Sequence, residues 1–249
     1  KECYILLHSV NEGIPAVPSR VLPLGGNPLA LALGDLNHDG LEDIAVAAER
    51  PNQISIYLQA ASDPVFSDSP QRAIPLSGSP TAFAIADVTS DSLKDLLVIS
   101  SPLDRLEVFH QLSGGAPYFN DTPDQNLSTG DGPAALAVGN LAGDEAQEVA
   151  VACWNFTAGE LDVYEQRGAA GLVKSQGILM DREAQKGPIS VAIGDVLGAA
   201  GQEGNEVVVA NQISGNLAVY AQDASGGLQG APARLLPTGA RPVSVVARD

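Results

Sequence analysis

The feature that most constrains this chain is a motif that returns about every 53 residues. Each copy is anchored by an acidic or amide side chain, and successive anchors lie 52, 53, 55 and 54 residues apart. A period this regular indicates a repeat architecture, in which each repeat is one supersecondary unit stacked on the next. The anchors are Asp35, Asp87, Asn140, Asp195 and Asp249.

The residues around each anchor predict four β-strands per repeat. The first strand precedes the anchor and is rich in small apolar residues, and the second follows the anchor's loop and is almost wholly apolar. The third ends near an aromatic residue, and the fourth is short and leads into a Gly/Pro turn. The predicted first strands are 29–34, 81–86, 134–139, 190–194 and 243–247; the second strands are 43–47, 95–99, 148–152 and 206–210; the third strands are 54–57, 106–109, 161–164 and 217–220; the fourth strands are 72–76, 177–180 and 233–236, with that of the second repeat somewhere between 122 and 129.

Four strands in a repeat of about 50 residues are typical of a β-propeller blade. Apolar second strands indicate burial on both faces, as when four-stranded sheets stack face to face. We therefore predict one all-β propeller domain over residues 1–249. Its complete blades span about 27–78, 79–131, 132–186 and 187–239, with partial blades at 1–26 and 240–249.

The partial blades leave two arrangements open. Residues 3–6 and 20–24 look like a third and a fourth strand without their first two, and residues 240–249 carry only a first strand and its anchor. These pieces either close a small five-bladed ring with a three-stranded blade, or belong to a larger propeller of about seven blades. We favour the larger propeller, because the chain stops inside a motif.

The loop after the first anchor has the composition of a calcium-binding loop. Hard cations such as Ca²⁺ take six to eight oxygen ligands at about 2.3–2.6 Å. Gly40 supplies the sharp turn, since glycine adopts positive φ without steric cost. An EF-hand begins in the same way, but it needs a Glu at the twelfth position, where Val46 stands, and helices on both sides. The five oxygen donors fall at alternate positions: the side chains of Asp35, Asn37, Asp39 and Asp43, and the carbonyl of Leu41.

The run Gly-Asp-Leu-Asn-x-Asp-Gly-x-x-Asp-Ile-Ala-Val-Ala at 34–47, followed by a strand with a terminal aromatic, resembles the FG-GAP/VCBS repeat of integrin-α-like propellers. The resemblance covers the whole chain at repeat level and is strongest in the first repeat. It implies a propeller, usually of about seven blades, with structural calcium in the hairpin between the first two strands of a blade. It also implies a secreted or cell-surface protein that adheres to other proteins or to glycans.

The resemblance transfers unevenly to the other loops. The second loop keeps Asp87, Thr89, Asp91, the Leu93 carbonyl and Asp95. Its turn glycine is replaced by Ser92 and Thr89 is a weaker ligand, so we expect a weaker or partly hydrated calcium site there. In the third and fourth loops, Ala142 and Leu197 replace the second ligand. We expect these two loops to be free of metal.

Composition excludes several classes of partner. The formal net charge of −17 is opposite to what phosphate neutralisation needs, so we expect no binding to nucleic acid. No apolar run is long enough to insert into a membrane. The two cysteines, Cys3 and Cys153, lie at non-equivalent points of the repeat, and we expect buried free thiols rather than a disulfide.

Signals for catalysis are sparse, and we predict no catalytic residue. None of the three histidines lies near a Cys or Ser motif that would suggest a nucleophile, and His-Glu-x-x-His, Gly-x-Ser-x-Gly and phosphate-binding glycine loops do not occur. The carboxylates gather in the repeated loops, where metal binding explains them better than acid/base chemistry. The alternative is the propeller domain of a polysaccharide-active enzyme such as a lyase.

A ligand face is expected on the side opposite the calcium loops. There, the links between blades lie beside the loops that join second to third strands. The third repeat places the only Trp of the chain next to a Phe in such a loop, and aromatic and Arg side chains are typical of binding hot spots. We therefore predict an extracellular module that binds a protein or a glycan, or else a scaffold that packs against further blades or domains. The residues proposed for this face are Arg50, Arg105, Trp154 and Phe156.

Overall fold

The protein is described from a computed structural model that covers residues 1–6, 13–62, 65–144, 146–198, 205–223 and 226–247. Its described part contains four four-stranded antiparallel sheets and one two-stranded sheet. The two-stranded sheet is β1 (Glu2–Ile5) and β2 (Arg20–Pro23); blade 1 is β3 (Asn27–Gly34), β4 (Asp43–Glu49), β5 (Gln53–Tyr57) and β6 (Arg72–Pro75); blade 2 is β7 (Ala82–Ala86), β8 (Asp95–Ser100), β9 (Arg105–Phe109) and β10 (Gln125–Ser128). Blade 3 is β11 (Pro133–Gly139), β12 (Glu148–Trp154), β13 (Gly159–Gln166) and β14 (Leu172–Leu179); blade 4 is β15 (Pro188–Gly194), β16 (Glu206–Asn211), β17 (Asn216–Tyr220) and β18 (Arg234–Pro237).

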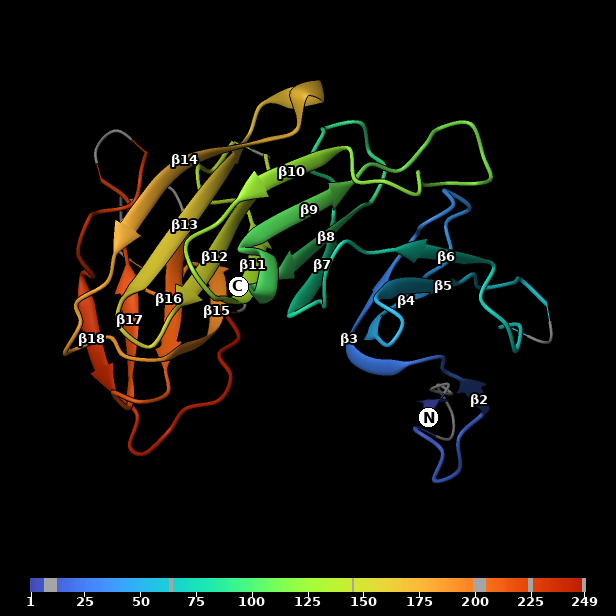
Figure 1. Cartoon of the computed structure of the whole chain (residues 1–249), viewed down its shortest axis with the longest axis horizontal. Coiled ribbons are helices and arrows are strands. Elements are labelled where there is room, and N and C mark those ends of the chain that lie inside the picture. The colour runs from blue at the N-terminus through green and yellow to red at the C-terminus, as the bar shows by residue number, and fades with distance from the viewer. Residues whose placement is uncertain (7–12, 63–64, 145, 199–204, 224–225, 248–249) are drawn as a thin grey trace.

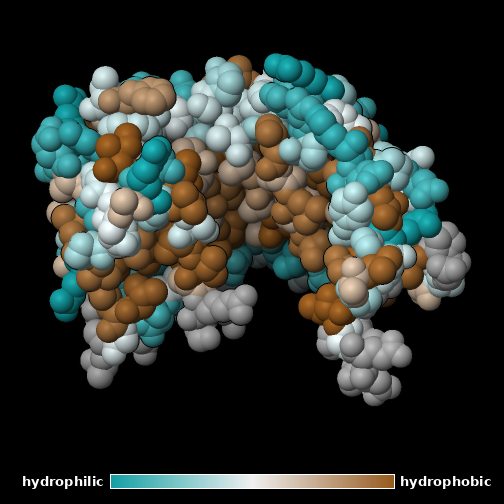
Figure 2. All heavy atoms as spheres, turned by 90° about the horizontal axis from the view of Figure 1, so that it is seen from below, coloured by the Kyte–Doolittle hydropathy of each residue, from teal (hydrophilic) through white to brown (hydrophobic). Residues whose placement is uncertain are grey.

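The strands of every blade are hydrogen-bonded in chain order, and the blades follow one another along an arc (Figure 1). Figure 2 shows this arc as an arch whose hollow is lined largely by apolar residues. The sheets do not close into a ring, so the small five-bladed ring is not the arrangement observed. The only helices of the described residues are two short 3₁₀ turns, η1 (Ser101–Leu103) and η2 (Gly168–Ala170), and none could cross a membrane.

The predicted strands agree with the structure to within a few residues, with two differences. The uncertain fourth strand of blade 2 is β10, and three of its four residues are polar, so its sequence lacks the apolar pattern that marks the other strands. The predicted strand 243–247 is not a strand, because no second strand pairs with it among the described residues. Each of the four complete predicted blade ranges contains one four-stranded sheet.

The core is divided among the junctions between sheets. The second strands β4, β8, β12 and β16 are buried, as their apolar sequences predict. Blades 1 to 3 each lie between two sheets, whereas blade 4 packs against blade 3 on one face and carries residues 245–247 on the other. One cluster, for example, joins Leu36, Ile54 and Ile74 of blade 1 to Leu96, Phe109 and Phe119 of blade 2. Each blade is therefore held by the faces that it shares with the next.

Small residues let the innermost strands approach closely. A Cβ added at Gly34, at the end of β3, would lie 2.8 Å from a side-chain carbon of Ile85 in β7. Gly139 of β11 stands in the same relation to Ile193 of β15. The small-residue composition of the predicted first strands is thus explained by contacts near the centre of the arc.

One face of β3 is exposed, although its sequence is almost wholly apolar. Leu29, Leu31 and Leu33 are about half exposed, at 50%, 49% and 58% of their surface. They alternate with Ala30 and Ala32, which are oriented toward blade 2. The leucines therefore face the two-stranded sheet, whose strands cover β4 and β5 but leave β3 uncovered.

Tyrosine hydroxyls fasten two of these junctions. The Tyr57 hydroxyl, at the end of β5, donates to the carbonyl of Pro23 at 2.9 Å, and the Tyr164 hydroxyl, in β13, donates to the carbonyl of Ser128 at 2.8 Å. In both cases the acceptor is the last residue of the preceding sheet's outermost strand. The aromatic that marks each third strand is thus a link between sheets as well as a core residue.

We expect Tyr164→Phe to lower the free energy of unfolding by about 1 kcal/mol, because it removes one buried hydrogen bond and leaves the Ser128 carbonyl without its donor. Tyr4→Phe is the matched control, since the Tyr4 side chain is 57% exposed and its hydroxyl bonds only to nearby Glu2. Urea unfolding of the two variants measures the difference. Equal stabilities would show that the hydroxyl at the junction contributes nothing.

Candidate functional site

The first loop, between β3 and β4, is held by hydrogen bonds from its own backbone to its polar side chains. Asp35 accepts from the Asp39 amide at 3.1 Å and from the Gly40 amide at 2.8 Å. Asn37 also accepts from the Asp39 amide, and Asp39 accepts from the Leu41 amide. These bonds curl the loop so that the predicted donors share one short turn. Gly40 has φ of 82°, as the predicted turn requires.

Asp43 differs from the other predicted ligands because it is fully buried. Its two oxygens accept from the amides of Leu36, at 2.8 Å, and Gln59, at 2.7 Å. Burial raises the pKa of Asp43 to about 6, against the effect of these bonds, and the nearby Asp39 and Asp35 carboxylates add to the rise. Asp43 therefore fixes the ends of two loops and contributes negative potential to the first one.

Desolvation alone would raise the pKa of Asp35, but hydrogen bonds from the backbone amides of Gly40, Asp39, Asn37 and His38 hold it below its usual value. Asp35 is thus ionised under ordinary conditions. The first loop consequently concentrates negative charge on oxygen atoms near its surface.

The second loop repeats this design. Asp87 accepts from the amides of Asp91, at 3.3 Å, and Ser92, at 2.8 Å, and Ser92 takes the glycine's place with φ of 69°. Asp95 is fully buried and accepts from the amides of Val88 and Gln111, each at 3.0 Å. Burial raises the pKa of Asp95 to about 6. The other predicted donors, Thr89, Asp91 and the Leu93 carbonyl, lie in the turn between them.

The third and fourth loops keep the buried carboxylate but lose part of the surface donor set, since Ala142 and Leu197 replace the second ligand. Glu148 accepts from the Leu141 amide at 2.6 Å, and Glu206 accepts from the Val196 amide at 2.9 Å. Both carboxylates are buried, and both lie at the position of Asp43. The last acidic position of the motif thus has a structural role in all four blades. Residues 145 and 199–204 of these loops lie outside the described part of the chain.

The first two loops fit calcium by the chemistry of their donors, which are all oxygen. In each loop, two surface carboxylates, one neutral side-chain oxygen and one backbone carbonyl come from a single turn, beside the buried carboxylate. No three His, Cys, Asp or Glu side chains of the described residues form a metal cluster by themselves. The fit of these two loops to calcium therefore rests on the chemistry of their donors and not on a converged set of carboxylates.

The predicted ligand face is only partly assembled. The links between blades and the loops between second and third strands lie at the ends of the strands away from the acidic loops. Arg50 is exposed in the β4–β5 loop, and Arg105 is half-buried at the start of β9. Neither arginine lines the depression that holds Trp154 and Phe156.

That depression has a volume of about 320 Å³ and spans three blades. Phe156 is 86% exposed, with φ of 71°, and Trp154 is half-buried with its indole N–H enclosed and without a hydrogen-bond partner in the described structure. Sequence reasoning missed Ile213, which is 62% exposed on the blade 4 side. An apolar residue within the polar turn 211–216 was its signal. The other blades contribute Thr81 and Ser101 from blade 2 and Gln212 from blade 4.

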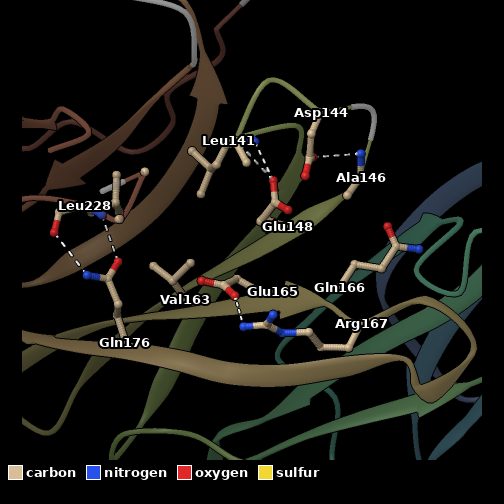
Figure 3. Close-up of a pocket in the computed structure, with 13 residues that line it drawn as sticks. Leu141, Asp144, Ala146, Glu148, Val163, Glu165, Gln166, Arg167, Gln176 and Leu228 are labelled. Atoms are coloured by element: carbon tan, nitrogen blue, oxygen red, sulfur yellow. Dashed lines mark hydrogen bonds and ion pairs between the residues drawn. The ribbon is translucent and has the colours of Figure 1, made fainter. Parts of the chain in front are cut away.

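A second, smaller depression of about 130 Å³ lies between blades 3 and 4 on the side of the acidic loops (Figure 3). Its charged groups are already paired: Arg167 is bonded to Glu165, and Glu148 accepts from Leu141. Gln176 and Leu228 bond to each other across its far side. These contacts make it a junction between blades rather than an open binding site.

The described histidines and cysteines form no metal-binding group. His38 is exposed in the first loop, and His110 is half-buried at the end of β9, whereas His8 lies outside the described residues. Both cysteines are free, and Cys153 is buried as predicted, while Cys3 is half-buried. Burial raises the pKa of the Cys153 thiol well above its usual value. A low-pKa nucleophilic thiol is thus not available at Cys153.

Comparison with known protein families identifies the repeat. The family model described as FG-GAP-like repeat matches residues 35–98, from the first anchor into the second strand of blade 2. Residues 35–98 therefore match an FG-GAP-like repeat, and blades 3 and 4, which follow this segment, have the same four-stranded topology. A search of curated proteins found no significant match.

Solved structures share the fold at low sequence identity. A candidate 6-phosphogluconolactonase from Bacteroides uniformis ATCC 8492 superposes with a TM-score of 0.67 at 11% identity, over 97% of this chain and 66% of that one. One from Bacteroides fragilis NCTC 9343 gives 0.66 at 12%, over 98% and 66%. BBS1N, crystallised in complex with ARL6DN, gives 0.56 at 17%, over 90% and 61%. The chain thus spans less than two thirds of these structures, and the likeness shows a β-propeller fold alone.

Proposed function

We propose that this protein is a non-catalytic, calcium-stabilised interaction module that works outside the cell and binds a protein or a glycan. The observation that carries the proposal is the division between its two sides. Acidic loops with oxygen donors occupy one side of the blades, and an aromatic depression with an exposed Phe lies on the other. A metal that braces the repeat and a separate surface that meets a partner would use these two sides independently.

The calcium would be structural. Asp35, Asn37, Asp39 and the Leu41 carbonyl would hold it in the first loop, with Asp43 beneath, and the corresponding residues would hold a weaker ion in the second. A bound cation supplies positive charge that would stabilise the ionised form of Asp43, whose pKa is raised first by burial and, to a smaller extent, by Asp39 and Asp35. Calcium of extracellular modules binds in the range of about 10⁻⁴–10⁻³ M, which suits a few-ligand site near the surface.

Removal of calcium with EDTA is expected to lower the melting temperature by several degrees, because a ligand that binds only the folded state stabilises it. Asp39→Ala should remove most of this response, since Asp39 is exposed and belongs to the first loop. Asp144→Ala, in the third loop, is the matched control and should keep it. Melting curves that are identical with calcium and with EDTA would rule out structural calcium.

Binding is proposed at the depression that holds Trp154 and Phe156. Exposed aromatic side chains supply contact area to proteins and stacking surfaces to sugars. BBS1N, with the same fold, is in complex with a protein, ARL6DN. This likeness supports a protein as one class of ligand.

We expect Phe156→Ala to weaken binding roughly tenfold, which is the loss of a typical aromatic hot spot. The ligand is to be found on a glycan array and among extracellular proteins, and its Kd then measured by titration. Leu179→Ala is the matched control, because Leu179 is 75% exposed on the same blade but outside the depression. Equal affinities of the two variants would place the ligand elsewhere.

The enzyme alternative is separated from this proposal by a lyase assay on acidic polysaccharides. Polysaccharide cleavage that remains with the protein through repurification, and that is lost in a substituted variant that still folds, would favour the propeller domain of a polysaccharide-active enzyme. Binding without cleavage would favour the interaction module. If the protein shows neither binding nor cleavage, the remaining proposal is that it is a scaffold between other domains.

A further inference from the structure

One contact recurs at every junction between sheets. The first residue of a fourth strand, or its register equivalent in the longer β14, reaches the loop between the third and fourth strands of the following blade or, in blade 3, the first residue of β14. Arg20 donates to Asp68 at 2.5 Å, and Arg72 donates to the Phe119 carbonyl at 3.0 Å and to Asp121 at 2.5 Å. Gln125 exchanges hydrogen bonds with the backbone of Leu172. Gln176 exchanges hydrogen bonds with the backbone of Leu228, and Figure 3 shows this second pair. We call this contact the clasp.

The clasp has two chemical forms. Where the first partner is Arg, the following loop presents an aromatic and, two residues later, an Asp: Phe66-Ser-Asp68 and Phe119-Asn-Asp121. Where it is Gln, the loop presents the backbone of a Leu that has no Asp two residues later. Arg can only donate, so it needs a carboxylate or carbonyl, whereas Gln can both donate and accept. In all four loops the apolar residue is buried: Phe66, Phe119, Leu172 and Leu228.

Blade 4 carries the first half of a clasp without the second. Arg234 faces Val219 in the register in which Arg72 faces Ile56 and Gln125 faces Val108. It is exposed and has no hydrogen-bond or ion-pair partner among the described residues. The residue at the clasp position of blade 4 is therefore an arginine whose guanidinium group has no partner from a following blade.

Apolar residues near Arg234 are also more exposed than their equivalents in the other blades. Leu236 is 45% exposed, whereas its equivalents Leu22 and Ile74 are fully buried by the next blade. Val196 is 44% exposed, whereas its equivalents Leu36 and Val88 are fully buried. These residues belong to a groove of about 380 Å³ on the outer face of blade 4, with Val208, Val219 and residues 245–247.

Residues 243–247 already lie where the innermost strand of another blade belongs. The Val245 amide donates to the Ser190 hydroxyl of β15 at 3.1 Å. A Cβ added at Gly194 would meet the Ala247 Cβ at 2.6 Å, as one at Gly34 would meet Ile85 in β7. The segment thus packs on blade 4 as β7 packs on blade 1.

We propose that the outer face of blade 4 is a docking surface for the second to fourth strands of a fifth blade, whose innermost strand is residues 243–247. The occupant therefore supplies three strands, and the loop between its third and fourth strands has the sequence of the Arg form of the clasp. Its third-to-fourth-strand loop presents an aromatic that covers Leu236 and, two residues later, an Asp that pairs with Arg234. The pattern of the other junctions, together with the charge of Arg234, specifies this chemistry.

The test adds such a blade to the full chain. A second copy of residues 88–131, which carries Phe119-Asn-Asp121, is joined after Asp249, the anchor equivalent to Asp87. In this fusion, Arg234→Gln is expected to lower the melting temperature by about 2–4 °C, and Asp121→Asn in the added copy should have no further effect in its presence. In the unextended chain, Arg234→Gln should leave the melting temperature unchanged.

A second fusion tests the chemical form of the clasp. Residues 141–186, which carry the Leu172 loop, are joined after Asp249 in place of 88–131. Here Arg234→Gln should raise the melting temperature, because glutamine matches this loop. An effect of the same sign in both fusions would overturn the assignment of Arg234.

Docking itself is read from Leu236→Cys. In the first fusion the new thiol should react with a maleimide at least tenfold more slowly than in the unextended chain, since the added aromatic covers it. An equal rate, including the case in which the added strands fail to fold, would overturn the proposal. A concentration-dependent dimer of the unextended chain that Arg234→Gln abolishes, detected by sedimentation, would assign the face to a second copy instead.

Discussion

Asp95→Ala is expected to lower the free energy of unfolding by about 3–5 kcal/mol, because it leaves two buried amides without an acceptor. Asp95 has no exposed surface, and it accepts from Val88 in its own loop and from Gln111 after β9. Each buried N–H that loses its partner costs about 1–3 kcal/mol. Since the equivalent carboxylate recurs in every blade, the expected role of this residue is to stabilise the fold, whether or not a metal binds to its loop.

The measurement is urea unfolding in EDTA, which separates this role from calcium. Asp91→Ala is the matched control, because Asp91 is exposed in the same loop and accepts only from the Leu93 amide. In EDTA it should cost less than about 1 kcal/mol. If the two variants lose equal stability in EDTA, the buried carboxylate has no special structural role.

Phe119→Ala is expected to cost about 3–5 kcal/mol, the usual range for a large aromatic removed from a core. Phe119 is completely buried in the cluster that joins blades 1 and 2, and its carbonyl accepts from Arg72. The cavity would open in the middle of the junction, between Ile74 and Phe109. Because the neighbouring strands are held in ladders, little collapse can fill it.

Phe156→Ala is the control for this prediction, since Phe156 is 86% exposed and should leave the melting temperature unchanged. Thermal unfolding followed by circular dichroism compares the two. A loss below about 1 kcal/mol for Phe119→Ala would mean that the junction between blades 1 and 2 is loosely packed.

The repeat, the strands and the acidic loops could be predicted because each depends on residues close together in sequence. The period of the anchors defines the blade, and the alternation around Asp35 defines the loop. The dual use of Asp43 could not be predicted, since its second donor, the Gln59 amide, belongs to another loop. A carboxylate in a motif looks the same whether it binds metal or an amide.

The contacts between blades were hidden for a similar reason. Arg72 and Asp121 are 49 residues apart, and neither stands out among the charged residues of its segment. Of the four residues predicted for a ligand face, Trp154 and Phe156 share a depression, but Arg50 and Arg105 lie outside it. Which loop tips meet depends on how neighbouring blades are rotated, and no local pattern reports that rotation.

The clasp has a consequence for how such an arc comes apart. Each clasp and each tyrosine bond joins only adjacent sheets, so the total stability is a sum of blade terms and nearest-neighbour terms, as in a one-dimensional lattice. Opening then starts at an end, where a blade has a single neighbour, and moves inward. A cut between two blades breaks one set of fastenings, whereas a cut within a blade exposes ladder edges as well. The segment that can be added to or removed from this architecture with the fewest broken contacts therefore runs from the end of one fourth strand to the end of the next.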